Sequence, residues 1–174
     1  MHTTNHPTPE LRQLAKLIDG QRIAMLTTLS TEGDLESRPM TVVDFDSDGR
    51  VWLFCEHDPQ DATARERHRR LNLAFSNERS STFISLPGRG QIVHDRERIH
   101  ELWSPTLKPW FPDGPDSPRL ALLKVTLERA EYWDAPDNRV VRGLALAVSI
   151  AAGKPMGLGE HGVLSTAHAA GTSR

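Results

Sequence analysis

Apolar and polar positions along residues 22–56 form three short strand-like runs separated by turn residues. The runs are rich in apolar, β-branched and threonine residues, and they lie at 23–29, 40–45 and 51–55. Glycine and aspartate in the segments between them, 31–34 and 47–49, are typical of tight turns. The pattern predicts a β-meander, around which the rest of the chain is organised.

Pro39 lies in the middle of this meander. Proline has no N–H to donate to a strand ladder, so in a sheet it is confined to edges, bulges and places where something else replaces the neighbouring strand. A bound ligand is one such replacement.

A helix is predicted immediately before the meander. Thr8 suits its N-cap, Pro9 suits its first position and Gly20 suits its end. The apolar residues that share one face of this helix are Leu11, Leu14, Ala15 and Ile18. We expect this face to cover one mouth of a barrel.

Later apolar runs predict more strands, at 71–75, 82–86, 91–93, 120–127 and 130–133. Gly88 and Gly90 are expected to bend the chain between two of them, and Asp95 is expected to cap a helix that ends at Leu102. A short helix is predicted at 144–152. The fold predicted from these elements is mainly β, with some helix: a six- to seven-stranded antiparallel β-barrel with flanking helices.

The 174 residues fit one domain, since no repeat or shift in composition marks a second. Residues 1–7 are polar and without periodicity, which predicts a flexible N-terminal tail. Residues 157–174 are glycine, histidine and small polar types, which predicts a disordered C-terminal tail. Residues 8–156 then form the barrel domain.

Composition excludes several classes of function. A net charge of −2 gives no basic field for nucleic acid or an anionic membrane surface, and no apolar run approaches the roughly 20 residues of a membrane-spanning helix. One cysteine, Cys55, leaves no internal disulfide, and no secretory signal is evident. We expect a cytoplasmic protein.

No familiar catalytic motif stands out. The chain has no GxSxG elbow and no GxGxxG loop, and its eight histidines are scattered, so hydrolysis, a Rossmann site and a metal site are not supported. Asp44 and Asp46 adjoin a turn, where aspartate is favoured, and we interpret both as turn residues.

The segment from Trp103 to Pro118 combines three aromatic residues with five prolines, which predicts a rigid irregular loop. Its aromatic side chains either cap the domain's own core or line a pocket or a dimer seam. The sequence leaves both open.

Two blocks of motifs resemble a known family. The first is SRPM at 37–40 followed by VWLFC at 51–55, and the second runs ELWSP, KPWFPDG, DSP and AEYWD between residues 101 and 134. Together they resemble the general-stress-protein branch of the pyridoxamine 5′-phosphate oxidase-like split barrels, over residues 11–153. The resemblance implies a split barrel that binds flavin mononucleotide (FMN), or FAD, at the interface of a homodimer.

The resemblance also implies roles for residues. Arg38 would contact the flavin phosphate or ring, Pro39 and Met40 would give backbone and packing contacts, and Trp110 would come from the partner subunit. The alternative for Arg38 is an ordinary strand arginine paired with Glu36 or a nearby aspartate. The candidate cofactor-binding residues are Ser37, Arg38, Pro39, Met40, Phe54, Cys55, Asp61, Arg65, Lys108 and Trp110.

Residues 58–70 are predicted to form a polar helix. It is either a solvated surface helix or one whose N-terminus and an arginine face a phosphate. Where the family has lysine, this chain has Asp61, and where it has a hydroxyl residue, this chain has Cys55. Either Asp61 caps the helix while Arg65, one turn later, reaches the phosphate, or FMN binds poorly.

We therefore expect a flavin-binding redox protein of the stress-response kind, in which the flavin carries the electrons. The alternatives are a non-enzymatic module that binds flavin or another small anion, and a barrel that has lost its cofactor. A true pyridoxamine 5′-phosphate oxidase ranks last, because no basic cluster for a second phosphate is evident near the C-terminus. No catalytic acid or base stands out.

Overall fold

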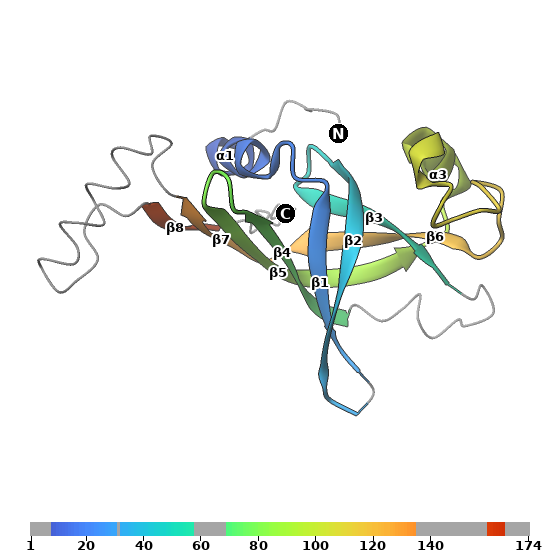
Figure 1. The fold of residues 1–174 in the computed structure, drawn as a ribbon, viewed down its shortest axis with the longest axis horizontal. Coiled ribbons are helices and arrows are strands. Elements are labelled where there is room, and N and C mark those ends of the chain that lie inside the picture. Colours follow the sequence, from blue (N-terminus) through green and yellow to red (C-terminus); the bar gives the residue numbers. More distant parts are fainter. Residues whose placement is uncertain (1–7, 31, 58–68, 135–159, 166–174) are drawn as a thin grey trace, which may run out of the picture.

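The computed structural model describes residues 8–30, 32–57, 69–134 and 160–165, and strands dominate it (Figure 1). Its elements are α1 (Pro9–Ile18), β1 (Ile23–Leu29), β2 (Leu35–Phe45), β3 (Arg50–Glu56), β4 (Arg69–Asn77), β5 (Thr82–Val93), α3 (Arg96–Leu102), the 3-10 helix η1 (Pro105–Leu107), β6 (Leu120–Leu127), β7 (Arg129–Asp134) and β8 (Glu160–Ser165). The predicted mainly β fold is confirmed.

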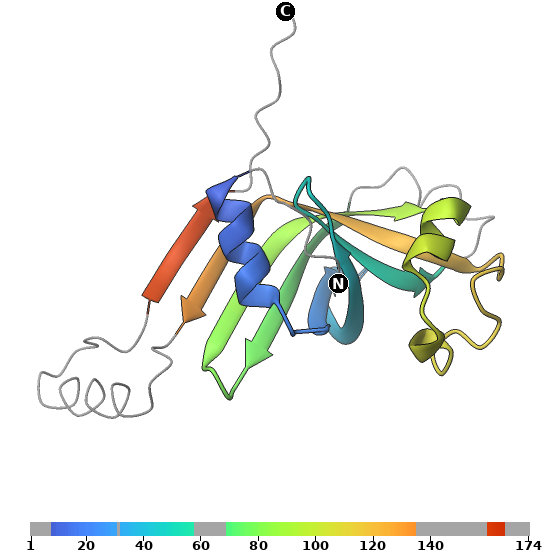
Figure 2. The same ribbon diagram turned by 90° about the horizontal axis from the view of Figure 1, so that it is seen from above.

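Six of the described strands close into an antiparallel barrel. They are hydrogen-bonded in the order β4-β1-β2-β3-β6-β5, and β4 also pairs with β5 to complete the ring. The same sheet continues past β5 through β7 and β8, which lie outside the closed part (Figure 2). The predicted antiparallel barrel with flanking helices is therefore confirmed.

Helix α1 lies over one end of the barrel, as predicted (Figure 1). The Thr8 side chain caps it by accepting a hydrogen bond from the Leu11 N–H at 3.2 Å. Leu14 and Ile18 are fully buried and pack into the barrel core. Within the described ranges, no helix is both long and apolar enough to cross a membrane.

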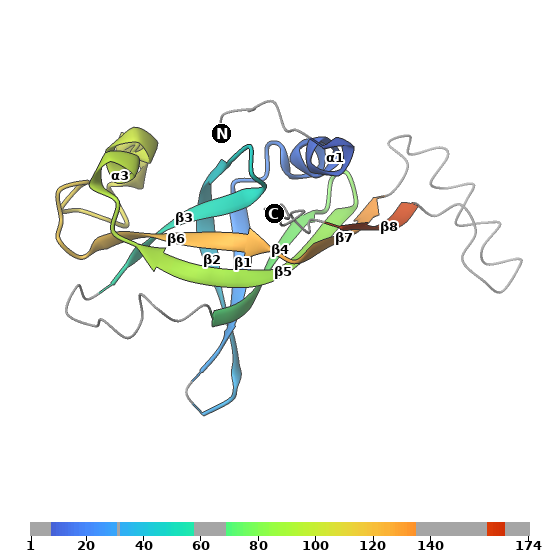
Figure 3. The same ribbon diagram turned by 180° about the vertical axis from the view of Figure 1, so that it is seen from behind.

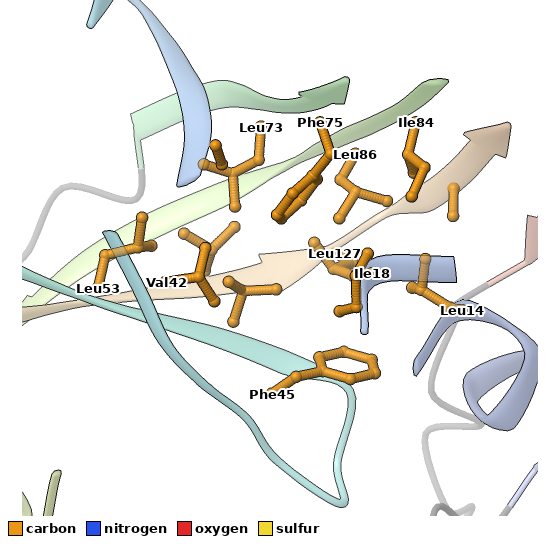
Figure 4. Packing of buried hydrophobic residues seen from close by; sticks show 14 of the residues in the cluster. Leu14, Ile18, Val42, Phe45, Leu53, Leu73, Phe75, Ile84, Leu86 and Leu127 are labelled. Atoms are coloured by element: carbon orange, nitrogen blue, oxygen red, sulfur yellow. The ribbon is translucent and has the colours of Figure 1, made fainter. Parts of the chain in front are cut away.

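The barrel interior is filled by alternate residues of its strands (Figure 4). Leu26, Leu53, Leu73 and Leu86 come from four different strands, and each is fully buried. Phe45 adds a large ring to the same core cluster as Leu14 and Ile18 of α1. This core fixes which side chains of each strand point inward, and therefore which ones point outward.

A second buried cluster is formed by side chains of α3 and η1 and by the outward-pointing side chains of β3 and β6. It contains Trp52, Phe54, Ile99, Leu107, Leu120 and Leu122. The cluster attaches α3 and the loop after it to the barrel, at the opposite end from α1 (Figure 3).

Gly88 and Gly90 do not separate two strands, contrary to prediction. Strand β5 runs unbroken from Thr82 to Val93. A Cβ atom added at Gly88 would lie 2.5 Å from the Thr126 carbonyl oxygen, and one at Gly90 would lie 2.6 Å from a methyl carbon of Leu71. The glycines therefore allow neighbouring strands and side chains to approach closely.

Two strand boundaries also differ from the prediction. β2 begins at Leu35, before Pro39, and β4 includes Arg69 and Arg70, which were assigned to the helix at 58–70. The rest of that predicted helix and the one at 144–152 lie outside the described residues.

Residues 160–165 were expected to belong to a disordered tail, but they form β8. This strand pairs with β7 along its length, with Tyr132 opposite Gly162. A Cβ atom at Gly162 would lie 2.5 Å from the Tyr132 ring, so glycine makes room for the ring. Small polar composition alone did not reveal this strand. The domain boundaries themselves remain predictions.

Asp46 is a turn residue as predicted, but Asp44 is not. The Asp46 carboxylate accepts hydrogen bonds from the Arg50 N–H at 2.9 Å and from the Trp52 indole N–H at 2.8 Å. The Asp44 side chain is buried, next to an irregularity in the β2–β3 register, and forms an ion pair with Arg98 of α3 at 2.6 Å. This pair ties α3 to the barrel.

Candidate functional site

Strands β2 and β3 separate partway along their length. Their ladder begins at Phe45 and ends where Val42 pairs with Leu53. Both strands continue, β2 back to Leu35 and β3 on to Glu56, and there β2 pairs with β1 while β3 pairs with β6. Among the described strands, nothing fills the space between them, so the barrel is split here, as the resemblance implied.

The free edge of β2 explains the position of Pro39. The Val42 N–H donates to the Arg22 carbonyl at 2.8 Å, on the β1 side. Backbone groups alternate along an antiparallel strand, so those of Ser37, Pro39 and Thr41 point to the other side, toward the split. The N–H that proline lacks would have pointed into the split and met no strand there.

The edge of β3 faces the same space. The His57 N–H donates to the Arg119 carbonyl at 2.8 Å, on the β6 side. By the same alternation, the backbone groups of Phe54 and Glu56 point toward β2. The split is therefore bordered on two sides by backbone hydrogen-bonding groups beyond the last ladder pair.

A hollow of about 420 Å³ occupies the split. Its lining comes from β2, β3 and the loop after α3: Arg38, Pro39, Met40, Thr41, Phe54, Cys55, Glu56, Leu107, Trp110 and Phe111. The volume lies within the roughly 300–1,000 Å³ typical of small-molecule sites. A neighbouring hollow, between Glu56 and Phe111, offers only about 10 Å³, roughly the room for one water molecule.

The outer wall of the hollow is aromatic. Leu107 anchors the loop because it is a buried member of the second cluster. The Phe111 ring lies 5.9 Å from the Phe54 ring, centroid to centroid. Trp103 contacts Phe54 edge-on at 5.8 Å. Trp110, by contrast, is 65% exposed and borders the hollow. The loop aromatics thus serve both purposes that the sequence left open, core packing and pocket lining.

Cys55 of β3 also lines the hollow, but its thiol is not reactive. Burial raises the pKa of its thiol from 9.0 to about 12, an effect that the positive charge of Arg38 only partly opposes. The Sγ atom donates to the Ala121 carbonyl at 3.7 Å. At neutral pH the residue is a protonated thiol and not a thiolate nucleophile.

Among the described residues that line the hollow, one is a cation and one is an anion. Arg38 is exposed, and no described residue forms an ion pair with it, so the alternative of pairing with Glu36 is not observed. The Glu56 carboxylate is paired with Arg119 at 3.2 Å. No described residue therefore competes with an anionic ligand for the Arg38 guanidinium.

The structure brings together most of the candidate residues. Those that line the hollow are Arg38, Pro39, Met40, Phe54, Cys55 and Trp110. Trp110 was expected from a partner subunit, yet it borders the hollow of its own chain. The Ser37 hydroxyl shares a hydrogen bond with Thr27 at 2.8 Å, and Lys108 is an exposed residue at the end of η1; neither lines the hollow. Asp61 and Arg65 lie outside the described residues.

Four lining residues were not predicted: Thr41, Glu56, Leu107 and Phe111. Three of them directly follow predicted residues along the chain, so a wider window around each motif would have found them. Leu107 is different, because its role depends on how η1 docks against the barrel, which no local pattern reveals.

The family model described as "Pyridoxamine 5′-phosphate oxidase like" matches residues 9–156. Among curated proteins, protein bli-3 of Neurospora crassa is 28% identical over 158 residues, which cover 84% of this chain and 75% of that protein.

Solved structures of similar fold include the general stress FMN/FAD binding protein of Xanthomonas citri. It is 31% identical, with a TM-score of 0.59 over 73% of this chain and 90% of that one. General stress protein 26 of Bacillus anthracis shares the fold at 20% identity, with a TM-score of 0.58 over 70% of this chain and 92% of that one.

Proposed function

This chain belongs to the pyridoxamine 5′-phosphate oxidase-like family, in its general-stress branch, and on this premise we propose that it binds FMN in the β2–β3 split and acts as a flavin-dependent redox protein. The observation that carries the proposal is the 420 Å³ hollow with an aromatic wall, two backbone edges and one available arginine. A related structure at 31% identity is that of an FMN/FAD binding protein.

The residues of the hollow fit the parts of FMN. The Trp110 ring offers a face on which a flat heteroaromatic ring can stack. The backbone edges at Pro39 and Glu56 offer hydrogen-bonding groups to ring heteroatoms, and Arg38 offers charge-assisted hydrogen bonds to a phosphate. When bound, the flavin would supply the electron or hydride transfer, while the chain orients it and excludes water.

The visible absorption spectrum tests this proposal. Protein that is purified, mixed with FMN and freed of unbound ligand should carry the flavin band at up to one FMN per chain. Protein that emerges colourless from the same treatment, with no protein fluorescence change during FMN titration, would refute flavin binding.

We also propose a homodimer that forms through the outer face of the sheet. Ile23, Met25, Phe83, Trp133 and Val163 are large apolar side chains on this face, each between 41% and 59% exposed. The face is continuous, since cross-strand pairing links β2, β1, β4, β5, β7 and β8 in turn. Exposed apolar surface of this extent is typical of protein interfaces.

A second copy is the occupant we propose, because the face reaches the hollow: Met25 pairs directly with Pro39. The variant Met25→Glu would place a charge inside the interface and should shift the protein toward monomer in sedimentation velocity at micromolar concentration. The control Glu97→Lys changes an exposed residue of α3, which packs on β3 and β6 and not on this face, and should remain dimeric. A monomeric wild-type protein, with and without FMN, would contradict the dimer.

A non-enzymatic flavin-binding module is the second candidate. The observation in its favour is that the hollow offers no free acid or base among its described residues, since Cys55 stays protonated and Glu56 is ion-paired. Reoxidation of photoreduced FMN by quinone or ferric acceptors distinguishes the two functions. A redox protein should raise the reoxidation rate by at least about tenfold relative to free FMN, whereas a storage module should leave it unchanged or lower it.

The roles of Asp61 and Arg65 remain proposals from the sequence. If Arg65 reaches the phosphate, Arg65→Ala should weaken FMN binding while Asp61→Lys gains little. A large gain for Asp61→Lys with no effect at Arg65 would favour the opposite arrangement.

A further inference from the structure

Trp110 and Phe111 lie on a loop without strand pairing, residues 103–118. Its described backbone hydrogen bonds are mostly short-range turns, such as Phe111 N–H to the Leu107 carbonyl at 3.1 Å and Gly114 N–H to the Phe111 carbonyl at 3.1 Å. The first half of the loop is fixed by buried Leu107. The second half, residues 112–118 (the return limb), must be held by something else.

The side chain of Arg96 contacts the return limb at three carbonyl groups. One terminal nitrogen donates to the carbonyls of Pro115 at 3.1 Å and Ser117 at 2.9 Å, and the other donates to the carbonyl of Pro118 at 3.4 Å. A guanidinium can do this because its donors form a rigid planar fork. A lysine ammonium has three donors on a single atom and cannot span the same carbonyls.

Arg96 is itself held firmly, since it begins α3. The Asp95 side chain caps this helix by accepting from the Arg98 N–H at 3.0 Å, and Ile99 is fully buried beneath it. Arg98 pairs with buried Asp44 and lies 5.3 Å above the Trp52 ring. Burial lowers the pKa of Arg98, but nearby carboxylates, Glu101 first, outweigh this and raise it, so its charge is permanent.

The other charged contact between α3 and the return limb is weak. His100 meets Asp116 at 3.0 Å, but these side chains are 51% and 86% exposed. Exposed pairs of this kind contribute little, and this one also depends on protonation of the histidine. Arg96 is therefore the main polar link between the docked helix and the return limb.

We propose that Arg96 is a positioning residue for the binding hollow: by fixing the return limb it holds Trp110 and Phe111 against the split. This inference rests on the proposed flavin function, because the wall it positions is the one on which the flavin ring would stack. The second cluster and the Arg98–Asp44 pair keep α3 in place without Arg96, so its loss should loosen the loop and not the barrel.

The experiment compares wild type, Arg96→Ala, Arg96→Lys and the control Arg50→Ala, whose ion pair with Asp48 lies at the β2–β3 turn, at the other end of β3 from the hollow. Hydrogen exchange of the FMN-free proteins reports on the loop. In Arg96→Ala, amides of residues 110–117 should exchange at least about tenfold faster, while those of β1, β4 and β5 are unchanged. The FMN dissociation constant should rise about tenfold, and bound FMN should fluoresce more strongly as its contact with Trp110 loosens.

The remaining outcomes of these measurements also decide whether Arg96 positions the loop. Arg96→Lys should resemble Arg96→Ala, and full recovery by lysine would show that charge suffices and overturn the proposal. Unchanged loop exchange, a uniform increase across the barrel, or a loosened loop with unchanged FMN affinity would each overturn it as well. If wild type binds no FMN, the proposed function fails, and hydrogen exchange alone still decides whether Arg96 holds the loop. If Arg96→Ala does not fold, the lysine variant carries the comparison.

Discussion

Replacing Arg38 with alanine isolates the electrostatic part of the proposed site. The side chain is exposed at the border of the hollow, and among the described residues it has no ion-pair partner. Its removal therefore leaves no buried charge unpaired, and the neighbouring Pro39 and Met40 keep their strand positions. The replacement should therefore remove only the interaction between Arg38 and the ligand.

The size of the loss follows from the exposure of Arg38. A charge-assisted hydrogen bond contributes about 1.5–3 kcal/mol. Coulomb attraction between unit charges at about 4 Å lies between about 1 kcal/mol in water and about 4 kcal/mol near a protein surface. Because Arg38 is exposed, we expect a value near the lower end, about 2 kcal/mol, which weakens FMN binding about 30-fold.

Fluorescence titration with FMN and with riboflavin separates phosphate from ring contacts. Arg38→Ala should lower the affinity for FMN about 30-fold. It should change the affinity for riboflavin little, because riboflavin has no phosphate. The FMN effect should shrink at high salt, and Arg38→Lys should restore part of it. An unchanged FMN affinity, or an equal loss for both ligands, would refute the phosphate role.

Three other predictions follow. Asp44→Ala leaves Arg98 without its buried partner and should lower the free energy of unfolding by about 3 kcal/mol in urea titrations, whereas Asp48→Ala removes an exposed pair with Arg50 and should change it by less than about 1 kcal/mol. Because burial raises the pKa of Cys55 from 9.0 to about 12, ionisation favours the unfolded chain, so stability should decline as pH rises through that window. Cys55→Ser should show a smaller decline, and an identical pH profile would contradict the assignment. Trp110→Ala should weaken riboflavin and FMN binding alike, by about two- to tenfold, because it removes stacking and no charge; a loss for FMN alone would argue against stacking.

Local chemistry in the sequence was enough to predict most of the fold. The Thr8 cap, the apolar face of α1 and the strands of the meander follow from short-range rules, and all are present. Gly88 and Gly90 misled the prediction because a glycine that allows close strand approach looks the same in sequence as one that ends a strand. Strand β8 was missed because it depends on pairing with β7, about 30 residues earlier.

The candidate site was predictable to a similar degree. Pro39 indicated a strand edge from the missing N–H alone, and the split at that edge agrees with this. The position of the loop that forms the aromatic wall depends on tertiary contacts. Nothing local to Arg96 shows that its guanidinium meets carbonyls about 20 residues later, and nothing local to Asp44 shows that it lies beneath α3.

A crystal structure of the FMN complex would show directly whether the flavin occupies the split. We expect the flavin ring in the hollow between β2 and β3, with its edge at the backbone of Pro39, its face against Trp110 of the same chain and its phosphate within hydrogen-bond distance of Arg38. Flavin density elsewhere on the chain, or a ring that stacks only on residues of the partner subunit, would contradict it.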